Sequence, residues 1–261
     1  MKAIAFLIIF AASAFAQSPG PSVPVDQQNA AKAKALIDSA IQALGGDAYL
    51  NIKTITQEGR TYSFHLGNPN SVGVVFYRTY EYPDKERIEL TKKRDIAQVF
   101  TGIEGYEITY KGATPIPDKD LSSYIRRRQY SIDWVLRKWI HQPGIALFYE
   151  GQTVANQKAA EQVSIIDSHN QSVTLYFDID THLPVKKTFS WRDPADNQRN
   201  VEDEVWDNYK PVGGVMTPFT TARYYNGDMS NQRFLNSVTY NQPLDESKFQ
   251  VNFPNRSEPR K

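Results

Sequence analysis

The spacing of apolar residues changes along the chain and predicts helix, strands, helix and strands, in that order. Over residues 30–44 apolar side chains recur every three to four positions, which predicts an α-helix ending at Gly45-Gly46. From Ile52 onward apolar and polar positions alternate, which predicts antiparallel strands. Helical spacing returns over residues 118–141, either as one long helix or as two helices with a break near Gln129.

The number of expected strands indicates the fold class. We expect strands at residues 54–64, 72–82, 87–91, 96–100, 106–111, 146–154, 162–167, 173–177, 184–191, 201–209, 215–225 and 234–241. Asn226-Gly227, between the last two, is a strong hairpin signal, and a short helix or turn is expected over 243–249. A sheet of this size must curl to cover its apolar face. The expected fold is α+β and mainly antiparallel β: an incomplete, half-open β-barrel wrapped around an N-terminal helix and a mid-chain helical insertion.

The first sixteen residues have the pattern of a secretory signal peptide. Lys2 supplies a positive charge, residues 4–12 form a short apolar stretch, and Ala14-Phe15-Ala16 is a small-x-small site, so cleavage is expected between Ala16 and Gln17. A retained interfacial anchor is the alternative. The chain would then be exported and soluble. The expected organisation is a signal peptide over 1–16, a flexible segment over 17–27, a single domain over 28–254 and a loose tail over 255–261.

Composition narrows the classes of function. The chain has no cysteine, which excludes thiolate catalysis, disulfides and Cys-ligated metal sites. Its 30 basic and 29 acidic residues nearly cancel, which argues against nucleic acid as a partner. Its 15 Tyr, 13 Phe and 4 Trp suit half-buried strands or an apolar cavity.

Asp178, Asp180 and His182 place two carboxylates and a histidine close together in the sequence. A metal site would need the three side chains to converge on one point and leave positions open for water and substrate. However, they lie between two strongly β-patterned segments, and Asp and Thr favour turns because their side chains bond the local backbone. We therefore expect a turn, with no metal and no cofactor.

The chain carries no recognisable catalytic motif. His65, His141 and His169 are scattered, and residues as close in sequence as Asp167-Ser168-His169 do not normally assemble into a triad. Gly-x-Ser-x-Gly, His-Glu-x-x-His and the phosphate-binding loop pattern are all absent from the sequence. We expect a protein that is not an enzyme.

The helical segment 118–141 has two features, each with two interpretations. Its apolar stripe, from Leu121 to Ile140, is either ordinary core or a lid that closes an apolar cavity. Arg126, Arg127 and Arg128 are either a solvated helix face or contacts to anionic lipid head groups. The pattern alone leaves both choices open.

Short motifs follow one another in order over most of the chain. They are Ala43-Leu44-Gly45-Gly46, Tyr49-Leu50-x-Ile52-Lys53-Thr54-Ile55, Glu58-Gly59, Asp180-Thr-His-Leu183-Pro184-Val-Lys186, Tyr209-Lys-Pro-Val-Gly213-Gly214-Val215-Met-Thr-Pro218, and Asn241-x-Pro243-Leu-Asp245 followed by Phe249. Together they resemble the LolA/LolB-like periplasmic proteins. More narrowly, they are similar to the outer membrane lipoprotein-sorting protein branch of Gram-negative bacteria.

The resemblance implies a periplasmic protein with an incomplete β-barrel and an apolar cavity between barrel and helices. It implies carriage of a lipid or lipoprotein acyl chain without catalysis, and transient contact with a membrane surface or membrane protein. In LolA-type carriers an arginine on an early strand holds the helical lid. Arg78 and Arg60 are the counterparts to consider, and no motif assigns the role to either.

The leading hypothesis is therefore a periplasmic carrier that buries an acyl chain. The candidate cavity-lining residues are Val74, Phe76, Tyr80, Tyr124, Val135, Leu136 and Trp139. The alternative is a periplasmic protein-interaction or sensor module on the same scaffold, with the cavity filled by side chains.

Overall fold

The computed structural model describes residues 25–251. The expected signal peptide, its cleavage site between Ala16 and Gln17, and the expected tail over 255–261 lie outside the described residues. Helix α1 (Val25–Leu44) already begins within the segment 17–27 that was expected to be flexible. A short helix, α2 (Asp47–Leu50), follows it.

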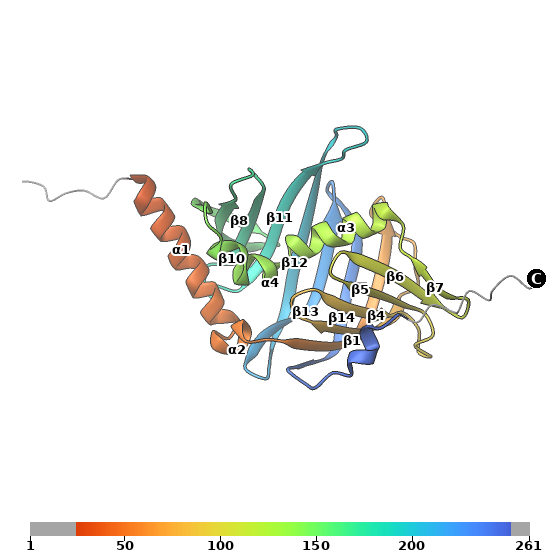
Figure 1. Cartoon of the computed structure of the whole chain (residues 1–261). Helices are drawn as coiled ribbons and strands as arrows, with labels where there is room; N and C mark the ends of the chain where they lie inside the picture. Colours follow the sequence, from red (N-terminus) through yellow and green to blue (C-terminus); the bar gives the residue numbers. More distant parts are fainter. Residues whose placement is uncertain (1–24, 252–261) are drawn as a thin grey trace, which may run out of the picture.

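Along the chain, a helical segment separates two groups of strands, and both groups join one sheet (Figure 1). The first group is β1 (Thr54–His65), β2 (Asn68–Pro69), β3 (Val74–Glu81), β4 (Lys85–Glu89), β5 (Ala97–Thr101), β6 (Glu104–Thr109) and β7 (Gly112–Pro115). The helical segment is α3 (Asp118–Gln129), α4 (Ile132–Arg137) and the 3-10 turn η1 (Trp139–His141). The second group is β8 (Ala146–Ala155), β9 (Lys158–Ile166), β10 (Ser172–Asp178), β11 (Pro184–Arg192), β12 (Arg199–Val212), β13 (Val215–Tyr225) and β14 (Asp228–Tyr240), followed by η2 (Glu246–Phe249).

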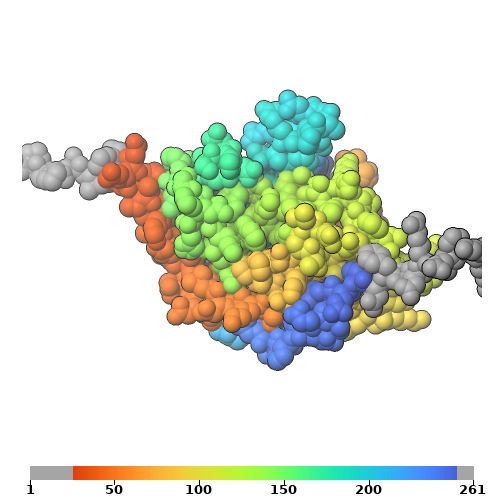
Figure 2. All heavy atoms as spheres, viewed as in Figure 1, coloured from red at the N-terminus to blue at the C-terminus, as the bar shows by residue number. Residues whose placement is uncertain are grey.

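All strands belong to one antiparallel sheet, in the order β7-β6-β5-β4-β3-β1-β14-β13-β12-β11-β10-β9-β8, with β2 paired only to β1. The two edge strands, β7 and β8, do not pair with each other in this order, so the curled sheet stays open, and the expected half-open barrel is confirmed. The chain must pass from one edge to the other through the helical segment. This connection lays α3 in front of the sheet (Figure 1). In the space-filling view, that segment and the strands beside it cover the front face (Figure 2).

The turns and breaks follow from local chemistry. Asn226 and Gly227 both have positive φ, at 50° and 91°, as a two-residue hairpin turn of type I′ requires. The helical segment is broken after Gln129, so the two-helix interpretation is confirmed. Ser131 caps the start of α4, and its Oγ accepts a hydrogen bond from the Trp134 N–H at 3.2 Å.

Two of the glycine motifs that carry the family resemblance touch each other. Gly45, at the end of α1, lies against Gly214, in the turn between β12 and β13. A Cβ on Gly45 would stand 2.3 Å from the Gly214 carbonyl oxygen, so no other residue fits without moving the backbone. The φ of Gly45 is 126°, a value that other residues rarely adopt. The close approach fixes the end of α1 against the sheet.

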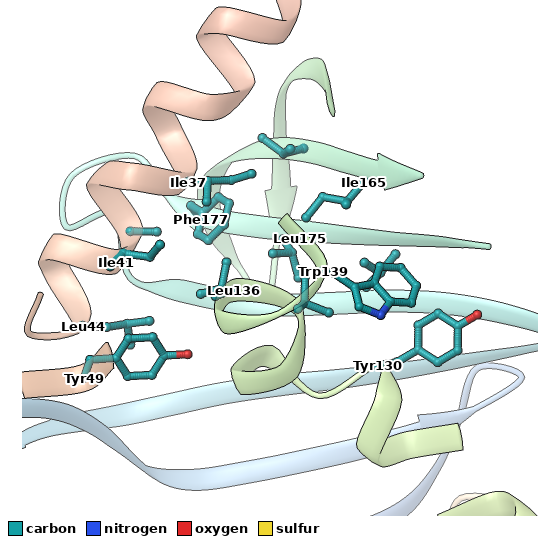
Figure 3. Packing of buried hydrophobic residues seen from close by; sticks show 14 of the residues in the cluster. Ile37, Ile41, Leu44, Tyr49, Tyr130, Leu136, Trp139, Ile165, Leu175 and Phe177 are labelled. Atoms are coloured by element: carbon teal, nitrogen blue, oxygen red, sulfur yellow. The ribbon is translucent and has the colours of Figure 1, made fainter. Parts of the chain in front are cut away.

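The main core lies between α1, α4 and the inner face of β8–β11 (Figure 3). Helix α1 buries the apolar stripe that its spacing predicted: Ala33, Leu36, Ile37, Ala40, Ile41 and Leu44. Helix α1 also protects the β8 edge, because the Asn29 side chain donates to the Tyr149 carbonyl and accepts from the Tyr149 N–H, both at 2.8 Å. This pairing occupies backbone groups that an open edge would leave free.

A second apolar cluster lies under α3. It is formed by Phe76, Ile88, Phe100 and Ile116, with Leu121 and Tyr124 of α3 packed on it. The Phe100 and Tyr124 rings stack with centroids 3.5 Å apart. Helix α3 has no fully buried residue, whereas Val135 and Leu136 of α4 are fully buried in the main core. The stripe expected over 118–141 is therefore divided between two clusters.

Candidate functional site

A cavity of about 460 Å³ lies between the concave face of the sheet and the α3–α4 segment. This volume falls within the range of pockets that hold small molecules. Its apolar lining comes from α1, the sheet, α4 and the segments between them, and includes Leu44, Ile52, Ile55, Ile88, Phe100, Ile116, Ile132, Phe189, Trp206, Val215 and Leu235. An acyl chain could contact such a surface along its length.

Charged side chains form a row across the cavity wall, on β4 and β3 and then on β14 to β11, while β1 between the two groups contributes the uncharged Gln57. We call the charged row the set Glu86 (β4), Arg78 (β3), Arg233 (β14), Arg223 (β13), Glu204 (β12) and Lys187 (β11), all of which line the cavity. It contains four cations and two carboxylates. The expectation of an apolar cavity is therefore wrong for this wall, because interior positions of six strands carry charge.

Both carboxylates of the charged row are bound by a cation. Arg78 donates to Glu86, and Lys187 Nζ lies 2.8 Å from Glu204 Oε2. Lys187 also donates to the Tyr130 carbonyl at 2.7 Å and is only 2% exposed. Burial alone would raise the pKa of Glu86 and Glu204, but the neighbouring cations hold each pKa below its ordinary value.

The two central arginines of the row have no ion pair with a carboxylate within residues 25–251. Arg223 donates to Asn231 Oδ1 at 3.3 Å, while the buried Arg233 Nε has no hydrogen-bond partner. Burial, together with the positive charges of Arg223 and Arg78, lowers the pKa of Arg233 to about 9. The wall thus has a local excess of positive charge.

Helix α3 is attached to the sheet by polar contacts. Tyr124 donates to Glu86 Oε2 at 2.5 Å, and Arg127 donates to Glu202 Oε2 at 2.7 Å. Arg128 donates to the carbonyls of Asp84 and Gly102 at 3.2 and 2.6 Å. These contacts, together with the packing of Leu121 and Tyr124 on the second apolar cluster, hold the helix over the cavity.

The arginine run is not a solvated helix face. Arg126 stacks over the Trp191 ring at 3.4 Å, and Arg127 and Arg128 bind the sheet as described above. Arg127 and Arg128 also line the cavity. In this structure all three guanidinium groups contact other parts of the same chain, so head-group contact by them stays a prediction.

Of the seven residues predicted to line a cavity, Tyr80 and Tyr124 do so. Phe76 lies in the cluster under α3, and Val135, Leu136 and Trp139 lie in the main core, outside the cavity lining. Val74 lies near the start of β3 with 38% of its surface exposed. Apolar periodicity alone does not tell a residue that packs in a filled core from one that lines a cavity, which explains why these five residues lie elsewhere.

The arginine considered as a lid holder has a clear structural position. Arg78 binds Glu86, and Glu86 in turn accepts the Tyr124 hydroxyl of α3. Arg60, on β1, is exposed and does not line the cavity. A connection between an early strand and the helix over the cavity therefore runs through Arg78, with Glu86 between them.

Several cavity tyrosines are strongly shielded from water. Burial raises the pKa of Tyr49, Tyr80, Tyr124 and Tyr209 well above its ordinary value, and that of Tyr240 to about 12. The Tyr209 hydroxyl donates to the Pro184 carbonyl at 2.8 Å, so its hydrogen bond is made within the protein. These residues form a polar but uncharged part of the lining.

The segment around Asp178 is a turn between β10 and β11, as predicted. Asp178 Oδ1 accepts from the Asp180 N–H at 3.1 Å, the Thr181 N–H at 2.8 Å and the Thr181 hydroxyl at 3.0 Å. His182 has a positive φ of 58° within the same turn. Over residues 25–251 no group of three His, Asp or Glu side chains could hold a metal ion.

Replacing Asp178 with alanine should lower the free energy of unfolding by about 1–2 kcal/mol, because three donors in the turn lose their common acceptor. Urea unfolding followed by circular dichroism measures this loss. Asp180→Ala is the matched control, since the Asp180 side chain is exposed, and its effect should stay within about 0.5 kcal/mol. Equal effects of the two variants would contradict the turn assignment.

No helix within residues 25–251 is long and apolar enough to cross a membrane. No protein-family model and no curated protein sequence matches this chain.

Solved structures nevertheless share the fold. A DUF1329 family protein from Desulfovibrio piger ATCC 29098 superposes with a TM-score of 0.59, at 10% identity, over 84% of this chain and 97% of that one. A protein described as an outer membrane lipoprotein-sorting protein domain, from Vibrio parahaemolyticus, superposes with a TM-score of 0.53 at 10% identity, over 83% of this chain and 97% of that one. A LolA superfamily protein from Nitrosomonas europaea superposes with a TM-score of 0.51 at 10% identity, over 84% of this chain and 97% of that one. The chain therefore has the fold of LolA-superfamily and outer membrane lipoprotein-sorting proteins.

Proposed function

We propose that this protein is a non-catalytic, periplasmic carrier that binds the acyl chain of a lipid or lipoprotein in the cavity under α3 and α4. The observation that carries the proposal is the 460 Å³ cavity itself, closed on one side by the sheet and on the other by the helical segment. The fold shared with lipoprotein-sorting proteins supports it. Apolar burial would contribute about 0.8 kcal/mol for each CH₂ group removed from water.

Movement of α3 would let the ligand enter and leave. Helix α3 has no fully buried residue and is held mainly by Tyr124, Arg127 and Arg128. A segment attached by polar contacts and little apolar burial opens at lower cost than the main core. A membrane surface or membrane protein that competes for these contacts would favour release.

Filling the cavity should remove acyl-chain binding without unfolding the protein. Thr221 lines the cavity on β13, so Thr221→Trp places an indole in the volume that the chain would occupy. We expect binding of a fluorescent acyl probe to weaken by about tenfold or more. Thr220→Trp is the matched control, because neighbouring strand residues point to opposite faces and Thr220 does not line the cavity. Circular dichroism checks the fold of both variants.

Leu136 is a poor site for the same test. It is completely buried in the main core, so a polar substitution there would unfold the protein rather than alter the cavity.

Native mass spectrometry of the purified protein separates the carrier from the alternative interaction or sensor module. Co-purifying lipid, lost in Thr221→Trp but kept in Thr220→Trp, supports the carrier. A protein that carries no lipid and takes up no acyl probe would contradict it and favour the interaction role.

A further inference from the structure

The strongest feature that acyl-chain binding alone does not explain is the pair of central arginines in the charged row. A cavity for a hydrocarbon chain needs no charge, and each buried cation costs free energy unless something compensates it. Arg78 and Lys187 each have a carboxylate partner, whereas Arg223 and Arg233 have no such ion pair within residues 25–251. The two cations of the row that lack an ion pair therefore lie next to each other on the wall.

The sheet register places the two guanidinium groups side by side. Arg233 lies opposite Thr221, and Arg223 lies opposite Asn231, so the two arginines are diagonal neighbours on adjacent strands. Diagonal neighbours on one face are about 7–8 Å apart, a spacing that lets two long side chains converge on one small anion. Both residues line the cavity, as do Thr221 and Leu235 beside them.

Each of the three glutamates that line the cavity already binds another cation. Glu204 lies directly opposite Arg223 in the register, but its Oε2 is bound by Lys187 at 2.8 Å. Glu86 accepts from both Arg78 and Tyr124. Glu202 accepts from Arg127 of α3. Within residues 25–251 no carboxylate forms an ion pair with Arg233, whose guanidinium carbon lies 5.3 Å from the centroid of the Phe76 ring.

We propose that Arg223 and Arg233 form a subsite for the single anionic group, a carboxylate or a phosphate, at the end of an acyl-chain ligand. This inference deepens the proposed function and rests on it. A guanidinium presents a planar fork of donors that matches both groups, and the buried Nε of Arg233 has no hydrogen-bond partner. The apolar lining that continues from Leu235 to Ile55 and Val215 would contact the hydrocarbon part.

A charge-matched set of ligands tests the subsite. Hexadecanoate, hexadecyl phosphate and hexadecanol compete for a fluorescent acyl probe on the purified full chain. We expect the affinity for each anion to exceed that for the alcohol by about tenfold or more, since charge-assisted hydrogen bonds form only with the anions. Arg233→Gln should remove this preference and leave hexadecanol affinity within about twofold. Arg60→Gln, an exposed arginine on β1, should keep the preference.

The unliganded stability of Arg233→Gln separates a binding role from a structural one. Because Arg233 lacks an ion-pair partner and lies beside Arg223 and Arg78, its removal should leave the thermal midpoint unchanged or higher. A lower midpoint would show that Arg233 serves the fold and would overturn the proposal.

The outcomes distinguish the two proposals. If none of the three amphiphiles binds, the carrier function itself fails. If the alcohol binds as tightly as the anions, or if Arg233→Gln keeps the preference, only the anionic subsite fails. Inorganic phosphate, added as a competitor, identifies the source of the anion. If it weakly reduces the binding of hexadecyl phosphate and leaves the binding of hexadecanol unchanged, the subsite serves the anionic group of a lipid. Binding as tight as that of hexadecyl phosphate would make a free anion the ligand and overturn the acyl-chain assignment.

Discussion

Glu86→Ala should destabilise the fold by about 3–5 kcal/mol, the cost of leaving one partner of a buried ion pair unpaired. Glu86 is 6% exposed and accepts from both Arg78 and Tyr124. Without it, Arg78 would face the charges of Arg233 and Arg223 with only Glu204 to balance the row. This single substitution removes both the ion-pair partner of Arg78 and the hydrogen-bond acceptor of Tyr124.

Urea unfolding followed by tryptophan fluorescence measures this effect, and hydrogen exchange over residues 118–129 shows whether α3 detaches. Glu107→Ala, at an exposed position on β6, is the control and should change stability by less than about 0.5 kcal/mol. The double variant Arg78→Met/Glu86→Leu removes both charges and should lose less than Glu86→Ala. A loss below about 1 kcal/mol in Glu86→Ala would show that the pair is not structural.

The architecture could be predicted because its signals are repetitive and local. Period-two alternation, the Asn226-Gly227 turn and the buried stripe of α1 each follow from neighbouring residues, and many independent strands agree on one fold class. Strand β7 (Gly112–Pro115) was missed because its four residues carry no alternating pattern. Its existence depends on pairing with β6, which is tertiary information.

The cavity could not be predicted in the same way. An apolar stripe looks the same whether it packs into a filled core, as Val135 and Leu136 do, or faces a void, as Ile132 does. The volume of a void depends on how several elements meet, and no single segment encodes it. Sequence periodicity therefore could not separate Tyr124, which lines the cavity, from Val135 and Leu136, which pack in the main core.

The charged row illustrates a second limit. Along β12, Val201 and Val205 make one face apolar and Glu202 and Glu204 make the other acidic, so alternation alone would place the glutamates outward. The structure turns the glutamates inward, where Lys187 of the next strand and Arg127 of α3 bind them. A buried carboxylate is tolerated only with its partner, and that partner is distant in the sequence.

The cavity tyrosines predict a sharp loss of stability above pH 10. Five of them (Tyr49, Tyr80, Tyr124, Tyr209 and Tyr240) have a pKa raised by burial. Above pH 10 the unfolded chain releases these protons while the folded protein retains them, so stability present below pH 10 falls as the pH rises. Each tyrosine contributes about 1.4 kcal/mol per pH unit, and the five together about 7.

Arg233 acts in the opposite direction but cannot compensate. Its pKa is lowered to about 9, so the folded protein loses that proton before the unfolded chain does, and stability rises with pH above 9. Arg223 and Arg126, whose pKa values are also lowered by burial, act in the same direction, and these three groups do not offset the five tyrosines. Since the total stability of a domain is about 5–15 kcal/mol, cooperative unfolding is expected within about two pH units above pH 10.

Circular dichroism and tyrosinate absorbance, recorded together from pH 8 to pH 12, measure this transition. The part of the tyrosinate absorbance that comes from the five buried hydroxyls should rise together with the loss of circular dichroism, because these hydroxyls ionise only as the fold opens. Tyr240→Phe should reduce the dependence of unfolding free energy on pH by about 1.4 kcal/mol per unit, whereas Tyr110→Phe, at an 88% exposed position, should leave it unchanged. Tyrosinate absorbance that rises fully while the circular dichroism stays native would contradict the burial of these side chains around the cavity.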